Sequence, residues 1–220
     1  DMPAELHEDL TISAILERED SRDVLISKKY HSLSDFTNTS SLGTSSVRRI
    51  CNIKYEYPNI QISDMRGNID TRINKVLDGD MDGIILAAAG VKRLGLEKYI
   101  TSYMDKKIWI PAIGQGAIGI ESRKNNKIIN DLVGKLNHKH TKICVDTERE
   151  VSKYFEASCS TPIAANAVID KDRIVLSSMI GAIDGSEKIY YQESGPIGSS
   201  KQIGFNVSSK LEQKGARKLL

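Results

Sequence analysis

Short apolar runs and longer stretches with apolar residues at helical spacing follow one another along most of this chain. In the first half the short runs predict strands at about 10–16, 23–27 and 60–63 and from residue 83. Helical periodicity, capping residues and stop signals predict helices at about 46–56, 68–77, 91–100, 125–136, 144–157 and 199–214. Strands that alternate with helices at this spacing favour parallel α/β units.

From residue 160 the pattern changes to three strand-like segments separated by turn residues. They are AANAVID, RIVLSSMIGA and KIYYQESG, and the last predicted helix follows them. Short turns between strands favour an antiparallel sheet, so we expect a separate α+β unit with a three-stranded antiparallel sheet. The Pro- and Gly-rich segment 111–122 should connect to a further strand, and the polar segment 31–42 should form a loop.

Composition narrows the classes of function. A net charge of +2 from 31 basic and 29 acidic side chains argues against nucleic acid as a partner bound through bulk charge. The three cysteines show no CxxC spacing, which favours neither a zinc site nor a disulfide framework and suits a reducing compartment. No apolar run has membrane-spanning length, so we expect a soluble protein with no membrane partner. Any targeting segment is expected to be absent or removed.

Arginines follow three consecutive predicted strands, at the carboxyl edge where α/β sheets place their ligands. They are Arg48 and Arg49, then Arg66 and Arg72, then Arg93. The first two lie in the first turn of a predicted helix, where free backbone N–H groups also favour an anion. For any single arginine, a solvated surface position is the alternative. Together they predict a crevice for a ligand with several carboxylate or phosphate groups.

Cys159 stands among small residues, in EASCSTPIAA, after a predicted helix and before a predicted strand. A small buried hydrophobe is the usual role of a single cysteine. In this loop, however, the sulfur should be accessible and able to form a covalent bond. No histidine close in sequence would serve as its base, so a Cys-His hydrolytic cycle is disfavoured. The pattern therefore favours covalent attachment of a group over turnover at sulfur.

Three other motifs fail the requirements of the sites they resemble. DGDMDG at 78–83 has the acidic spacing of a calcium loop, but Ala89 stands where the twelfth-position glutamate is required. NHKHTK offers His138 and His140 without an acidic or cysteine partner nearby, which predicts a solvated loop and no metal site. GQGAIG precedes a strand where a dinucleotide-binding loop would follow one, so its glycines are expected to serve a hinge.

Five segments in combination resemble the porphobilinogen deaminase family, also called hydroxymethylbilane synthase. They are GTSSVRR at 43–49, RGNIDTR at 66–72, ILAAAGVKRLGL at 85–96, PAIGQGAIGIE at 111–121 and SCSTPIAA at 158–165. The resemblance implies a transferase that condenses four porphobilinogen molecules head to tail to hydroxymethylbilane, with release of ammonia, in tetrapyrrole (heme) biosynthesis. It also implies a monomer in the cytoplasm, or in a plastid if the source is a plant or alga.

The resemblance implies a role for each matching residue. Cys159 corresponds to the cysteine that holds a covalently attached dipyrromethane cofactor through a thioether. Asp1, in DMP, corresponds to the catalytic aspartate that stabilises positive charge during each condensation. The residues that would bind the carboxylates of cofactor and substrate are Thr44, Ser45, Ser46, Arg48, Arg49, Arg66, Gly67, Asn68, Arg72, Arg93 and Gln115. No metal is implied.

The resemblance also implies an α/β fold with two domains like periplasmic binding proteins, the first incomplete here, and a small α+β C-terminal domain. We expect the remainder of domain 1 at 1–16 and 117–135, domain 2 at 17–116 and domain 3 at 136–220. Two hinge crossings, at about 17–22 and 109–116, would join the first two domains.

Two departures from the family pattern bear on activity. The family carries a further N-terminal part with substrate contacts, so we expect that part to be missing here and the activity of the chain as given to depend on it. Ala157 and Ser158 stand where the family has Gly-Gly, so a glycine-only backbone angle there would be strained. The alternatives are a non-catalytic two-lobed binding protein for a small polycarboxylate, which would not need Cys159, and an inactive fragment.

Overall fold

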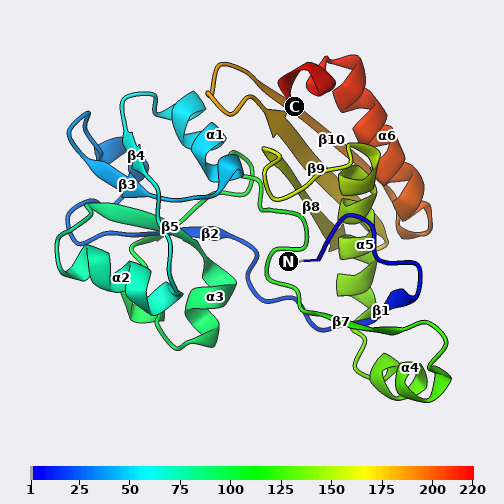
Figure 1. Ribbon diagram of the computed structural model, residues 1–220. Coiled ribbons are helices and arrows are strands. Elements are labelled where there is room, and N and C mark those ends of the chain that lie inside the picture. Colours follow the sequence, from blue (N-terminus) through cyan, green and yellow to red (C-terminus); the bar gives the residue numbers. More distant parts are fainter. Residues whose placement is uncertain (1) are drawn as a thin grey trace.

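The structure is a computed structural model that describes residues 2–220, and its elements form three groups around separate sheets (Figure 1). The strands are β1 Leu10–Ile15, β2 Asp23–Ile26, β3 Ser41–Gly43, β4 Gln61–Ser63, β5 Gly83–Ala87, β6 Ser102–Tyr103, β7 Gly119–Arg123, β8 Ile163–Asp170, β9 Arg173–Gly181 and β10 Lys188–Pro196. The α-helices are α1 Val47–Glu56, α2 Ile69–Leu77, α3 Ala88–Arg93, α4 Lys127–Gly134, α5 Lys139–Tyr154 and α6 Ser200–Gln213. The predicted α/β class is confirmed. None of the helices in residues 2–220 has the length and apolarity to cross a membrane.

The largest group is a five-stranded sheet with helices on both faces. Its strand order is β4-β3-β5-β2-β6, with β3 parallel to β4 and β5 and with β2 antiparallel to its two neighbours. Side chains alternate between the faces along β2. Val24 and Ile26 join the apolar cluster of α2 and α3, and Leu25 joins that of α1. The three parallel strands therefore bring the starts of α1, α2 and α3 to one edge of the sheet.

The C-terminal group is the predicted three-stranded antiparallel sheet, with the order β10-β9-β8. Helices α5 and α6 cover it, and their buried Val151 and Val207 share one apolar cluster with Leu176 of β9. The predicted α+β unit is confirmed.

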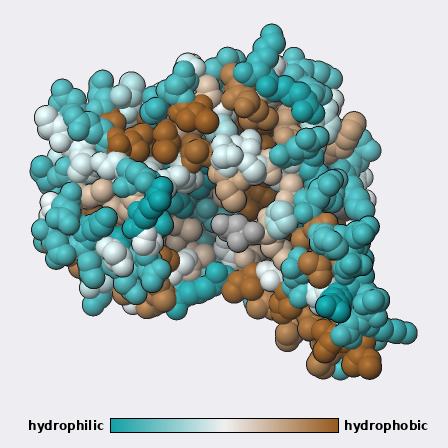
Figure 2. Space-filling view, in the orientation of Figure 1, coloured by the Kyte–Doolittle hydropathy of each residue, from teal (hydrophilic) through white to brown (hydrophobic). Residues whose placement is uncertain are grey.

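The third group is small and leaves an apolar surface exposed. Strands β1 and β7 form a two-stranded antiparallel sheet beside α4. No residue of α4 is buried, and Figure 2 shows apolar side chains gathered over this part of the molecule, at the lower right. The exposed fractions of Ile128, Leu132 and Leu136 are 82%, 59% and 58%.

Two chain crossings connect β1 to β2 and the end of the five-stranded sheet to β7, and they lie against each other. The backbone N–H of Glu19 donates to the Gly116 carbonyl at 3.1 Å, and that of Leu16 donates to the Ile118 carbonyl at 2.9 Å. A Cβ on Gly116 would come within 2.5 Å of the Glu19 carbonyl oxygen, and its φ of +85° also favours glycine. Gly116 therefore permits the close approach of the two crossings.

The fully buried carboxylate of Glu148, on α5, joins these crossings to the C-terminal sheet. Its Oε1 accepts from Arg18 Nη1 at 2.6 Å and from the Ala167 backbone N–H at 2.7 Å. Its Oε2 accepts from Arg18 Nη2 at 3.1 Å and from the Gly114 backbone N–H at 2.7 Å. One side chain thus ties both crossings and β8 to α5.

Three predicted element boundaries are wrong. The predicted helix 91–100 begins earlier, as α3 at Ala88, and ends before Gly95, whose φ of +67° suits the residue after a helix. The predicted helix 144–157 also begins earlier, because the HKH stretch forms the start of α5 with His138 at its N-cap. The predicted loop 31–42 contains a short 3₁₀ helix and runs into β3.

The turn between β9 and β10 packs on α1 and so links the two larger groups. Lys188 Nζ lies 2.6 Å from Glu56 Oε1 and 4.5 Å from the centre of the Tyr55 ring. A Cβ on Gly185 would come within 2.8 Å of backbone atoms of Lys54 and Tyr55. The turn therefore fits closely against the last part of α1.

We predict that Gly185→Ala destabilises the protein more than Gly79→Ala does. Both glycines have positive φ, +76° and +88°, so each substitution costs about 1–2 kcal/mol of backbone strain. At Gly185 the new Cβ also clashes with α1, which adds on the order of 1–3 kcal/mol, whereas nothing lies within 4 Å at Gly79. Urea unfolding midpoints measure the difference. Equal midpoints would show that the turn is not docked in solution.

Candidate functional site

A cavity of about 760 Å³ opens where the three groups of elements meet. Its apolar lining includes Ile12 and Ile15 from β1, Ile113 and Ile118 from the second crossing, and Ile163 from β8. Its polar lining comes from the start of α1, from α5 and from the loop after α5, as Ser46, Arg48, Arg149, Ser152, Ser158, Cys159 and Thr161. The cavity is thus apolar along part of its wall, with two guanidinium groups and a thiol.

Cys159 lies in a tight turn after α5, and its side chain is exposed. The Ser158 backbone N–H donates to Thr161 Oγ1, and the Thr161 N–H donates to the Ser158 carbonyl, both at 3.0 Å. The positive φ in this stretch, +50°, falls on Glu156, directly after the C-cap of α5. Ala157 and Ser158 do not have a positive φ, so the expected strain at these two positions is absent.

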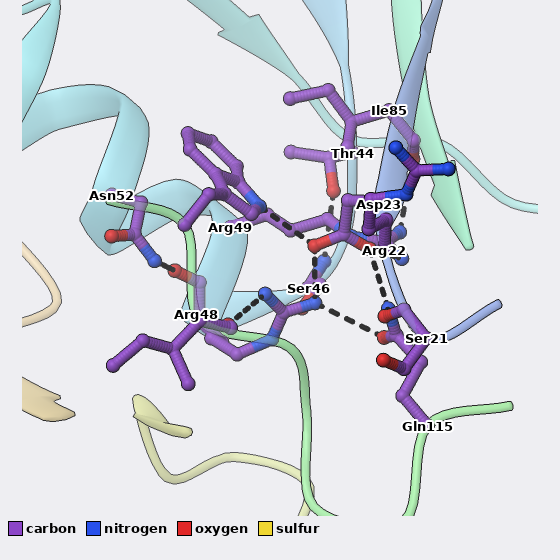
Figure 3. A network of polar contacts seen from close by, with 12 residues as sticks. Ser21, Arg22, Asp23, Thr44, Ser46, Arg48, Arg49, Asn52, Ile85 and Gln115 are labelled. Carbon is purple, nitrogen blue, oxygen red and sulfur yellow. Dashed lines mark hydrogen bonds and ion pairs between the residues drawn. The ribbon is translucent and has the colours of Figure 1, made fainter. Parts of the chain in front are cut away.

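Arg48 is buried, with 4% of its surface exposed, in the first turn of α1. Its Nη1 donates to the Ile110 carbonyl at 3.0 Å, and its Nη2 lies 2.7 Å from Asp23 Oδ2 (Figure 3). Its Nε is buried and has no hydrogen-bond partner among residues 2–220. A buried N–H donor without an acceptor is costly, so an acceptor from a ligand in this cavity would complete the site.

Asp23, at the start of β2, is fully buried and holds the arginines of α1 (Figure 3). Its Oδ1 accepts from Arg49 Nη2 at 2.7 Å and from Gln115 Nε2 at 3.1 Å, and its Oδ2 accepts from Trp109 Nε1 at 2.7 Å. Burial by itself would raise the pKa of this carboxyl group, but the Arg48 and Arg49 guanidiniums lower it to about 2.

The three other predicted arginines, Arg66, Arg72 and Arg93, do not line this cavity. Arg66 is 92% exposed at its side chain and lies 3.3 Å from Asp64. Arg72 Nε donates to the Gly67 carbonyl at 2.7 Å, and Arg93 Nη2 donates to the Gly116 carbonyl at 2.8 Å.

Among the remaining predicted residues, Thr44 and Ser45 hold the local backbone. Thr44 is buried, and its Oγ1 accepts from the backbone N–H of Ser46, which is the N-cap residue of α1. Ser45 Oγ donates to the Met65 carbonyl at 2.5 Å. Asn68 occupies the N-cap position of α2, with no hydrogen bond from its side chain. Asp1 lies outside the described residues.

Two residues at the site were missed by sequence reasoning. A charged residue at the head of the buried run DVLI is a signal that could have found Asp23. Arg149 gives no such signal, since it is one of several charged residues on a long amphipathic helix. In the structure it lines the cavity, and its Nη2 donates to the Pro3 and Ala4 carbonyls at 3.0 Å each.

Two family models match the chain. The model described as "Porphobilinogen deaminase, dipyromethane cofactor binding domain" matches residues 1–131, and the model described as "Porphobilinogen deaminase, C-terminal domain" matches residues 142–213. The expected dipyrromethane cofactor is therefore confirmed as the cofactor of the matching domain family.

Solved structures that match part of this chain include a lipoprotein and a periplasmic binding protein. A YaeC-family lipoprotein from Enterococcus faecalis is 15% identical over 64% of this chain and 68% of its own, with a TM-score of 0.40. An arginine-specific periplasmic binding protein from Salmonella typhimurium is 14% identical over 59% of each chain, with a TM-score of 0.38. This chain thus spans less than two thirds of the Salmonella protein, and likenesses at this level carry no argument about function.

We predict that ionised Asp23 stabilises the folded protein and that this contribution is lost in acid. Lowering the pKa from 3.8 to about 2 corresponds to a stabilisation on the order of 2 kcal/mol, present at pH values above the unfolded pKa and lost as the pH falls from about 4 to about 2. The Asp23→Asn variant should have a shallower fall in stability over this range. Urea unfolding at several pH values tests this, and an unchanged slope in the variant would contradict it.

Proposed function

This chain belongs to the porphobilinogen deaminase family, a family of transferase-type enzymes of tetrapyrrole biosynthesis, and we propose that it condenses four porphobilinogen molecules head to tail to hydroxymethylbilane. Each condensation would release one ammonia. The observation that carries the proposal is that Arg48, whose buried Nε–H has no acceptor among residues 2–220, and the exposed Cys159 line the same cavity. The ligand proposed for this cavity has carboxylates for the arginine and a carbon that bonds to the thiol.

The residues present fit the family's dipyrromethane cofactor. We propose that Cys159 holds it by a thioether and that the Arg48 guanidinium donates hydrogen bonds to one of its carboxylates. When bound, the cofactor supplies the pyrrole carbon to which the first substrate is joined. The apolar part of the cavity wall, with Ile113 and Val145, would cover the faces of pyrrole rings.

The predicted arginines would act at different depths. Arg48 and Arg49 are buried in the Asp23 network, whereas Arg66 and Arg93 are exposed and Arg72 is half-buried. We assign these three arginines to carboxylates of the later, outer rings, with Thr44, Ser45, Ser46, Gly67, Asn68 and Gln115 shaping or completing the binding surface. Guanidinium groups at fixed positions would hold the growing polycarboxylate in register.

Proton and charge handling falls to Asp1 in this proposal. Loss of ammonia leaves positive charge on the substrate pyrrole, and an adjacent carboxylate stabilises that charge while the next carbon–carbon bond forms. Arg149 holds the carbonyls of Pro3 and Ala4, which follow Asp1 in the chain, so α5 would help to position that segment.

The finer organisation is also proposed. Domain 1 would comprise 1–16 and 117–135, domain 2 would comprise 17–116 and domain 3 would comprise 136–220. The protein would act as a monomer in the cytoplasm, or in a plastid if its source is a plant or alga.

We predict a covalent adduct on Cys159 in the purified protein. Intact-mass and peptide mass spectrometry should find the cofactor on Cys159, and Cys159→Ser should remove it. The matched control is Cys144→Ser, because Cys144 is buried in the C-terminal core and should leave the adduct in place. A bare Cys159 thiol on protein that turns over porphobilinogen would overturn the tether. A bare thiol together with reversible porphobilinogen binding and no ammonia release would favour the binding-protein alternative.

We predict that Arg48→Ala and Arg66→Ala stall assembly at short pyrrole chains. Loss of one charge-assisted contact of about 1.5–3 kcal/mol should lower the turnover of porphobilinogen roughly tenfold to a hundredfold. The effect should be larger for Arg48, which is buried, than for Arg66, which is exposed. Arg173→Ala, at an exposed arginine of the C-terminal sheet, is the control. Mass spectra of the enzyme-bound intermediates and product formation provide the measurement, and unchanged values in both variants would remove these roles.

A further inference from the structure

We propose that Asp23 is a positioning residue for Arg48, and that it holds the guanidinium of this arginine at the cavity wall for a ligand carboxylate. The inference rests on the proposed function for the identity of the ligand. It assigns a role in ligand binding to a residue that does not line the cavity itself.

The orientation of Arg48 follows from which of its corners are occupied. Asp23 Oδ2 lies 2.7 Å from Nη2, Gln115 Oε1 accepts from Nη2 at 3.3 Å, and the Ile110 carbonyl accepts from Nη1 at 3.0 Å. The guanidinium is a rigid plane, so contacts at its two Nη corners fix the direction of the Nε–H bond. Within the part of the chain that the structure describes, that bond has no partner, and it belongs to a residue that lines the cavity.

The charges in this network also favour an anion. Two guanidiniums, Arg48 and Arg49, share one carboxylate, Asp23, so the hydrogen-bonded set carries a net charge of one positive unit. Desolvation of a cation is costly unless a counter-charge is near. Asp23 offsets enough of that cost for both arginines to be buried, and one positive charge remains for the ligand.

A purely structural role is the competing explanation, because Asp23 also joins β2 to the second crossing through Trp109. Two substitutions distinguish these roles, because they affect different bonds of the Asp23 carboxylate. In Asp23→Asn, if the side-chain oxygen still faces Arg49, the amide nitrogen faces Trp109 Nε1 and Arg48 Nη2. Three donors then lie together without an acceptor, so Arg48 is no longer held in place. Trp109→Phe removes a bond to the same oxygen and leaves both ion pairs in place.

The test compares Asp23→Asn with Trp109→Phe in the full chain. For Asp23→Asn we expect kcat/KM for porphobilinogen to fall roughly tenfold to a hundredfold, as for loss of a charge-assisted contact. Trp109→Phe should lower thermal stability but leave kcat/KM near that of the parent. Asp23→Asn should add little in an Arg48→Gln background, because it acts through that arginine. Equal losses of kcat/KM in Asp23→Asn and Trp109→Phe, or additive losses in the double variant, would overturn the proposal.

A second readout needs no turnover and so separates this proposal from the proposed function. The Arg48 Nε–H signal of ¹⁵N-labelled protein, assigned by its absence in Arg48→Lys, should be sharp in the parent and in Trp109→Phe, and broadened or lost in Asp23→Asn. A sharp, unshifted signal in Asp23→Asn overturns the positioning role whether or not the parent is active. If Asp23→Asn does not fold, the same comparison is made in an Arg49→Met background, between Arg49→Met and the double variant Asp23→Asn/Arg49→Met. The double variant then buries one positive charge, that of Arg48, instead of two.

Discussion

The arrangement of the whole chain depends on one buried carboxylate, that of Glu148. Its two oxygens accept from Arg18, from the Gly114 backbone and from the Ala167 backbone, which lie on the first crossing, the second crossing and β8. A fully buried charge needs such partners, since a carboxylate without them would be strongly destabilising. The hydrogen bonds to Glu148 therefore fix the position of the C-terminal unit against the two crossings. They also fix where the Cys159 loop lies relative to the first turn of α1.

Asp23 is a second buried carboxylate that needs hydrogen-bond donors, but its donors are of a different kind. Around Glu148 the donors are one arginine, two backbone amides and the side-chain amide of Asn166, whereas Asp23 receives two arginines, an indole and an amide side chain. The first carboxylate holds segments together with its charge matched by one guanidinium. The second leaves an excess of positive charge beside the cavity. Two buried acids of the same chemistry thus have distinct tasks because of the number of cations each one faces.

The parts of the structure that sequence could predict are the local ones. A parallel strand followed by a helix places its first-turn residues at the sheet edge, and this rule predicted Arg48 at that edge. The strand that precedes α1 is, however, β3, which lies partly in the predicted loop 31–42, whereas the predicted strand 23–27 is the antiparallel β2. The three-stranded C-terminal sheet followed from its turn spacing. The start of α5 was missed because a polar HKH stretch reads as a loop, although polar residues are common at a helix N-terminus.

Long-range contacts were beyond the reach of the sequence. Asp23 and Arg49 are 26 residues apart, and Arg18 and Glu148 are 130 residues apart, so neither ion pair leaves a periodic or local signal. The burial of Arg49 depends on the same contacts. From sequence alone, an arginine at a helix start can equally well contact solvent or a ligand. Only the position of β2 in the folded protein shows that Arg49 pairs with the buried Asp23.

The docking of the β9–β10 turn on α1 limits how the length of the chain can vary. Hairpin turns are ordinarily among the most tolerant sites for inserted residues, because their tips project into solvent. Here the tip at Gly185 touches the backbone of Lys54 and Tyr55, on the same helix whose first turn carries Arg48. Extra residues in this turn would have to displace the helix or the sheet. The turn therefore sets the distance between the unit that carries the thiol and the helix whose guanidinium lines the same cavity.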